Sequence, residues 1–146
     1  MARLNISQHA PQGFQAVADL DRYVRENLDD ILFDLVKLRA SQLNGCAYCV
    51  DMHATDLEKL GQPTRRIYAV SAWRDTGFFT ERERAALALT EAITLIATGL
   101  DDEVWDEAAR LFPERELSDL VLAIGTINVW NRICVSTLTA PPPLAG

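Results

Sequence analysis

The chain has 146 residues, of which 49% are apolar and 24% charged, so residues 1–146 can bury a core as one globular domain. The formal net charge is −7, and the basic residues are scattered apart from the pair Arg65–Arg66. This balance argues against nucleic acid and against anionic membrane surfaces as partners. The first residues lack the apolar segment of a secretory signal, and the apolar stretch 120–131 is too short to span a bilayer. We therefore expect a cytoplasmic protein that does not bind membranes.

Apolar residues recur at helical spacing from the start of the chain. The first half predicts three helices, over 13–26, 30–44 and 46–60. Asp29 or Asp30 caps the second helix, and Asn44–Gly45 ends it because both residues tolerate the left-handed backbone conformation. Gly61 ends the third. The two-residue link between the second and third helices predicts a tight antiparallel hairpin.

Four more helices follow in the second half, over 64–73, 81–98, 102–112 and 114–135. Thr80 and Glu83 form a capping box ahead of the second of these, and Gly99 ends it. The last helix is apolar around most of its circumference, so we expect a second subunit to cover part of it. No segment alternates as a strand does, and the pattern as a whole predicts an all-α bundle.

The cysteines carry the main chemical signal. Cys46 and Cys49 lie in the first turn of the third helix, where free amides and a partial positive charge stabilise a thiolate. His53 follows Cys49 by one turn on the same face, so it can take a proton from a thiol and later give one to a leaving oxygen. Cys134 is expected to be a small buried residue outside this centre.

An acid that orients His53 is expected from the neighbouring helix. The hairpin brings Asp34 nearly level with His53, and Asp34 stands beside an apolar stripe, where a buried carboxylate needs a partner. A first-turn acid stabilised by the helix dipole is the alternative explanation. Tyr48 is expected to pack beside the thiols. Ser41 and Asn44 can donate hydrogen bonds near the thiols or serve the turn and the helix end.

The stretch from Asp34 to His53 reads DLVKLRASQLNGCAYCVDMH. It resembles the AhpD-like alkyl hydroperoxidase branch of the carboxymuconolactone decarboxylase family, with an acid, two cysteines and a histidine at matching spacing. The segments 81–87 and 130–132 also resemble this family. Two residues depart from its pattern: Asp34 stands where the family usually has Glu, and Tyr48 stands where the best-known members have His.

The resemblance implies an AhpD-like helical bundle with the CxxC at the N-terminus of a central helix. It also implies an enzyme of antioxidant defence, which reduces alkyl hydroperoxides through a Cys46/Cys49 dithiol–disulfide cycle. Cys49 is then the attacking cysteine, Cys46 the resolving cysteine and His53 the proton shuttle, oriented by Asp34. The implied partners are a thioredoxin-like or lipoyl-type dithiol reductant and further copies of the chain in a trimer or hexamer.

Three alternatives stay open at this point. The first is a non-enzymatic redox relay or sensor, which forms the disulfide without peroxide turnover. The second is a decarboxylase or lactone-type enzyme on the same fold, in which His53 acts as a base. The third is a metal module held by Cys46, Cys49 and His53. The redox interpretation needs no organic cofactor and no metal.

Overall fold

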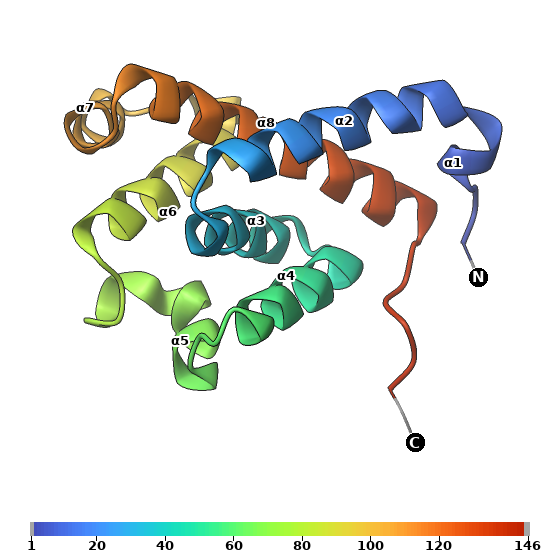
Figure 1. The fold of residues 1–146 in the computed structure, drawn as a ribbon, viewed down its shortest axis with the longest axis horizontal. Coiled ribbons are helices and arrows are strands. Elements are labelled where there is room, and N and C mark those ends of the chain that lie inside the picture. Colours follow the sequence, from blue (N-terminus) through green and yellow to red (C-terminus); the bar gives the residue numbers. More distant parts are fainter. Residues whose placement is uncertain (1, 145–146) are drawn as a thin grey trace.

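The computed structural model describes residues 2–144, which form helices and connecting segments without a strand. α3 (Asp30–Asn44) lies in the middle and packs against α4 (Ala47–Lys59), α6 (Glu81–Thr94) and α8 (Glu114–Thr137) (Figure 1). α2 (Pro11–Asn27) runs alongside α8. The remaining elements are α1 (Ile6–His9), α5 (Thr64–Tyr68), α7 (Asp102–Leu111) and two 3₁₀ segments, Ala69–Asp75 and Ile96–Thr98. The prediction of an all-α bundle is confirmed.

The predicted helices are present, and two of them end differently from the expectation. The helix predicted over 64–73 is α5 followed by a 3₁₀ segment, because Ala72 takes non-helical dihedral angles (φ −131°, ψ 36°). The helix predicted over 81–98 stops at Thr94, and a 3₁₀ turn continues to Gly99. The capping box of Thr80 and Glu83 is present as predicted.

The N-terminal segment carries a helix that the pattern did not indicate. α1 is only one turn long and too short for a recognisable period, but the Asn5 side chain caps it by accepting from the Gln8 amide at 3.3 Å. The amide of Arg3 donates to the carbonyl of Thr137 at 2.7 Å, which ties this segment to the end of α8. Figure 1 accordingly shows the N-terminal segment and the C-terminal tail on the same side of the bundle.

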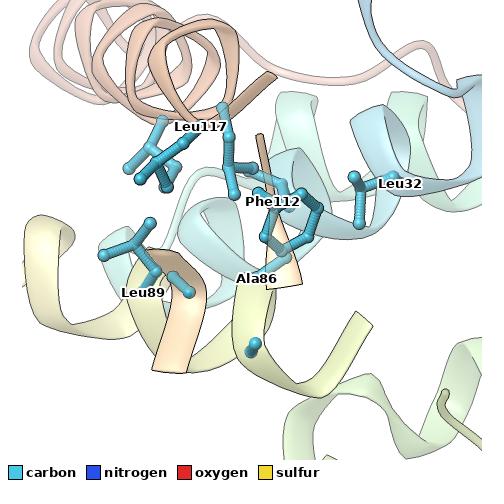
Figure 2. Close-up of a cluster of buried hydrophobic side chains, with 10 residues drawn as sticks. Leu32, Ala86, Leu89, Phe112 and Leu117 are labelled. Atoms are coloured by element: carbon cyan, nitrogen blue, oxygen red, sulfur yellow. The ribbon is translucent and has the colours of Figure 1, made fainter. Parts of the chain in front are cut away.

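One core cluster joins α3, α6, α7 and α8 on the side away from the termini. Leu32 of α3, Ala86 and Leu89 of α6, and Leu117 of α8 gather with Phe112, which caps the end of α7 (Figure 2). All five side chains are buried. Each large apolar side chain removed from water stabilises the fold by about 1.5–3 kcal/mol, so this cluster holds α3 firmly in place.

α8 is long and apolar enough to cross a membrane by length and composition alone. Its inner faces, however, pack against α2, α3 and α6, with Leu120, Ile124 and Ile127 fully buried. These contacts place one side of α8 in the core of the bundle. Leu122 and Val129 remain exposed on its outer face. The subunit contact expected on this helix stays a prediction.

Candidate active site

The α3–α4 hairpin brings the predicted residues together. Gly45 has a left-handed conformation (φ 67°, ψ 31°), which ends α3 and lets the chain reverse directly into α4. Cys46 is the N-cap of α4, and its sulfur accepts from the Cys49 amide at 3.4 Å. α4 then runs back along α3, so His53 faces the first half of α3, where Asp34 lies.

The two cysteines of the hairpin form a disulfide, with their Cα atoms 5.4 Å apart. Both residues are buried. The pair lies at the N-terminus of α4, where unpaired amides and the helix dipole favour negative charge. When the bond is reduced, this position therefore stabilises a thiolate relative to a thiol.

His53 and Asp34 form a buried pair. Nδ1 of His53 lies 2.9 Å from Oδ1 of Asp34, and both side chains are almost completely shielded from solvent. A carboxylate only accepts hydrogen bonds, so Nδ1 carries the proton and Nε2 is the basic nitrogen of the neutral ring. The expected pairing of the acid with the histidine is thus present, and it leaves Nε2 free for proton transfer.

Two cations and an aromatic ring surround this pair, and sequence reasoning did not select them. The Arg25 guanidinium lies 3.5 Å from Oδ1 of Asp34. It also lies 4.2 Å from the centre of the Phe33 ring, and the Lys37 ammonium lies 4.1 Å from the same centre. The rings of His53 and Phe33 lie nearly perpendicular to each other, with their centres 6.4 Å apart. The stacked cations compensate the carboxylate charge that α3 buries here.

Lys37 is the more unusual of the two cations because it is only 1% exposed. Its ammonium forms an ion pair with Asp21 of α2. Burial lowers the pKa of Lys37, and the Asp21 charge offsets only part of that effect. The only sign of this burial in the sequence is that Lys37 stands within the otherwise apolar run Leu35–Leu38.

A pocket of about 460 Å³ opens beside these groups. Cys49, His53, Lys37 and Asp21 are among its polar lining residues, and Cys46 is not among its lining residues. The rest of the wall is mainly apolar and comes from the N-terminal segment 2–7, α2, α4 and the end of α8. The rings of Phe14 of α2 and Trp130 of α8 meet edge to face there, with their centres 5.1 Å apart. The sulfur of the pair that an entering molecule can meet is therefore that of Cys49.

The other three residues predicted near the thiols have different surroundings. Tyr48 packs against the cluster that holds both cysteines, as expected, and it also lines the pocket. Ser41 accepts a hydrogen bond from the Asn131 side chain at 3.0 Å, and Asn44 donates to the side chains of Asn131 and Asn128. Ser41 and Asn44 thus fasten the hairpin to α8, and the Ser41 hydroxyl donates to the carbonyl of Lys37 at 2.6 Å and not to a sulfur.

The side chains that lie close enough together to bind a metal differ from the ligand set expected from the sequence. The sulfurs of Cys46, Cys49 and Cys134 all lie within 4.8 Å of one another. The ring of His53 instead groups with the carboxylates of Asp34 and Asp56. Arg25 lies 3.9 Å from Asp56 and 3.5 Å from Asp34, so a cation already occupies the space beside these carboxylates. The three residues proposed together as metal ligands therefore fall into two separate groups.

A family model supplies an independent comparison. The model of the carboxymuconolactone decarboxylase family matches residues 8–92, which is more than half of the chain and includes the whole α3–α4 hairpin. The chain belongs to this family. Family membership and the buried CxxC at the start of α4 confirm the resemblance drawn from the sequence.

Individual relatives agree with this assignment. The uncharacterized protein YdfG of Bacillus subtilis is 38% identical over 136 residues, covering 92% of each chain. YnjA of Escherichia coli, also uncharacterized, is 30% identical over 74% of this chain and 59% of its own. A crystal structure from Agrobacterium tumefaciens, of a protein of unknown function suggested to be the antioxidant defence protein AhpD, is 38% identical. It superposes with a TM-score of 0.95 over 99% of this chain and 100% of its own.

The fold also occurs in a protein with different chemistry. The debrominase Bmp8 superposes with a TM-score of 0.84 over 92% of this chain and 74% of its own, at 22% identity. At this identity the likeness shows the shared fold alone. The fold therefore does not select one reaction, and the function has to be argued from the site.

Proposed function

We propose that this protein reduces organic hydroperoxides to alcohols through a dithiol–disulfide cycle of Cys46 and Cys49. The observation that carries the proposal is that Cys49 and His53 open into one largely apolar pocket, while the disulfide partner Cys46 lies behind Cys49. A peroxide entering this pocket would meet the thiolate sulfur and the basic nitrogen on the same wall. The antioxidant suggestion for the related structure from Agrobacterium tumefaciens points to the same class of reaction.

In the first step, Cys49, His53 and Asp34 act together on the peroxide. Nε2 of His53 takes the thiol proton of Cys49, and the charge of the resulting imidazolium is balanced by Asp34. The Cys49 sulfur attacks the terminal oxygen of the peroxide, the O–O bond breaks, and the sulfur keeps the OH as a sulfenic acid. The alkoxide that leaves takes the proton from His53 and departs as the alcohol.

The second step closes the disulfide. The Cys46 sulfur attacks the Cys49 sulfur, the S–O bond breaks, and the hydroxide leaves as water with the thiol proton of Cys46. The position of Cys46 as N-cap of α4 keeps it in contact with Cys49 at this stage, since its sulfur accepts from the Cys49 amide. The sum is one peroxide and two thiols converted into one alcohol, one water and one disulfide.

The regeneration step needs a dithiol from another molecule. We propose a thioredoxin-like or lipoyl-type partner, which would reduce the pair by thiol–disulfide exchange. Both bonded cysteines are buried, so the thiol of the partner must enter through the pocket. Of the two, Cys49 lines that pocket and Cys46 does not. We further propose that the active form is a homo-oligomer in which the exposed apolar side chains of α8 meet another copy.

The test starts from the reduced protein. On addition of one equivalent of cumene hydroperoxide, the free thiols should fall from three to one per chain, and cumyl alcohol should appear in equal amount. The Cys49→Ser variant should consume no peroxide. A thiol count that stays at three while a peroxiredoxin control is oxidised would exclude the peroxidase reaction.

Turnover distinguishes an enzyme from a redox relay. With excess dihydrolipoamide, a peroxidase consumes many equivalents of cumene hydroperoxide, at a rate that rises with protein concentration, whereas a relay shows negligible turnover above the rate without protein. Because the pocket wall is mainly apolar, kcat/KM should be higher for cumene hydroperoxide than for hydrogen peroxide. Equal values for both would mean that the peroxide does not react inside this pocket.

A further inference from the structure

Cys134 is the only cysteine that the proposed cycle does not use. It lies on α8, far from the hairpin in sequence, and it is a buried free thiol. Its sulfur nevertheless lies within 4.8 Å of the sulfurs of both Cys46 and Cys49. Cys134 packs in the same apolar cluster as the two bonded cysteines, with Ile127 of α8 and Ala40 of α3 completing that contact.

The pocket adds a second observation. Cys134 and Cys49 both line it, whereas Cys46 does not. When Cys49 carries a sulfenic acid on the pocket side, the thiol on the same side is therefore that of Cys134. The two sulfurs lie within 4.8 Å of each other, and rotation of the two side chains about their Cα–Cβ bonds can shorten this distance toward the bonding distance of about 2.05 Å.

We propose that Cys134 is a second resolving cysteine, which captures the sulfenic acid of Cys49 when Cys46 has not done so. This inference rests on the proposed function, because it requires that peroxide first oxidises Cys49. The Cys134 sulfur attacks the Cys49 sulfur, the S–O bond breaks, and the hydroxide leaves as water with the thiol proton of Cys134. The product is a Cys49–Cys134 disulfide between α4 and α8.

The order of the two resolving cysteines follows from their surroundings. Cys46 is in direct contact with the Cys49 backbone at the positive end of α4, where a thiolate is stabilised. Burial raises the pKa of the Cys134 thiol, so Cys134 remains protonated and reacts more slowly. Cys134 thus acts when Cys46 is blocked, and it would keep Cys49 from further oxidation to the irreversible sulfinic acid.

The Cys46→Ser variant isolates this step. Serine is a favoured N-cap residue, so α4 should keep its start, and Cys46→Ala serves as a second variant if Ser itself perturbs the site. The reduced variant receives one equivalent of cumene hydroperoxide and is digested under non-reducing conditions for mass spectrometry. We expect a peptide pair joined through Cys49 and Cys134 and a fall in free thiols from two to none.

The matched control is Cys46→Ser combined with Cys134→Ser. In this control Cys49 should accumulate as a sulfenic acid that dimedone traps, and excess peroxide should convert it to the sulfinic acid. If the single variant yields as much dimedone adduct on Cys49 as the control, Cys134 does not resolve and the inference is overturned, while the proposed peroxidase step stands.

A failure of the peroxidase step itself gives a different pattern. If Cys49 of both variants stays a free thiol with peroxide, the proposed function and this inference fail together. Diamide, which oxidises two neighbouring thiols directly, measures the approach of the two sulfurs without any sulfenic acid. Diamide should form the Cys49–Cys134 bond in Cys46→Ser, and its absence there would show that the sulfurs do not meet.

Discussion

Replacing Asp34 with Asn tests the carboxylate–imidazole pair that the proposed reaction needs. The two side chains have nearly the same shape, so the substitution removes the negative charge and leaves the packing of the buried site almost unchanged. In the native protein, Oδ1 of Asp34 accepts from Nδ1 of His53 at 2.9 Å, and the carboxylate is completely buried. The charge of Asp34 is therefore poorly screened by water at the point where His53 becomes positive.

The size of the effect follows from the bond that is lost. A hydrogen bond to a charged group contributes about 1.5–3 kcal/mol. If this contribution is made to the transition state, in which His53 carries the thiol proton, its loss lowers the rate of Cys49 oxidation by about 10- to 100-fold. An Asn amide that donates to Nδ1 would also hold the ring proton on Nε2, the nitrogen that must act as the base. This second effect adds to the loss of charge, so we expect the rate to fall at least about 10-fold.

The assay is stopped-flow mixing of the reduced protein with cumene hydroperoxide. Trp130 packs against the cluster that contains Cys46 and Cys49, so its fluorescence should report disulfide formation. Asp51→Asn is the matched control, because Asp51 is exposed on the same helix as His53. Asp34→Glu, which keeps the charge, should recover part of the rate if the carboxylate acts on His53.

Two outcomes would refute this reasoning. The first is an Asp34→Asn rate within twofold of the native rate in a variant that folds normally, because the charge would then not contribute to proton transfer. The second is a larger loss of rate in Asp34→Glu than in Asp34→Asn, which would mean that the shape of the Asp34 side chain matters and its charge does not. Urea unfolding of each variant separates a loss of folding from a loss of rate.

Three further predictions concern stability, each measured by urea unfolding. Gly45→Ala should destabilise the fold by about 1–2 kcal/mol because Gly45 has φ 67°, and Gly45→Asn should cost less. Thr80→Ala should cost about 1 kcal/mol through loss of the capping box, and Thr80→Ser should not. Burial lowers the pKa of Lys37 below 10.5, so the unfolded chain binds more protons there in the window just below 10.5. The free energy of unfolding, relative to Lys37→Met, should therefore rise with pH in that window, by at most about 1.4 kcal/mol per pH unit; a flat or falling difference would contradict the burial effect.

The helices and the central motif were predictable because their signals are local. The apolar period, the Thr80–Glu83 box and Gly45 each act within one or two turns of chain, so the residues that decide them stand next to one another in the sequence. The 3₁₀ segment after α5 was not predictable in this way. Its apolar spacing still fits a helix, and only the non-helical backbone at Ala72 reveals the break.

Asp34 is an intermediate case. Its pairing with His53 joins two helices, yet it could be predicted because the connection between these helices is so short that it fixes their register. Arg25 also contacts Asp34, but α2 meets α3 at an angle that no local pattern specifies. The same holds for Ser41 and Asn44, whose partners Asn131 and Asn128 come from the far end of the chain.

The sequence by itself determined where α3, α4, α6, α7 and α8 start and that two sulfurs and an imidazole share one face of α4, because backbone dihedral angles and helical spacing are set by near neighbours. Only the tertiary structure decided that Cys49 and not Cys46 opens into a pocket, that Lys37 is buried in its wall, and that Cys134 lies beside the pair. These arrangements depend on how α2, α3, α4 and α8 pack, and packing is decided by the complementary shapes of side chains that are distant in the sequence.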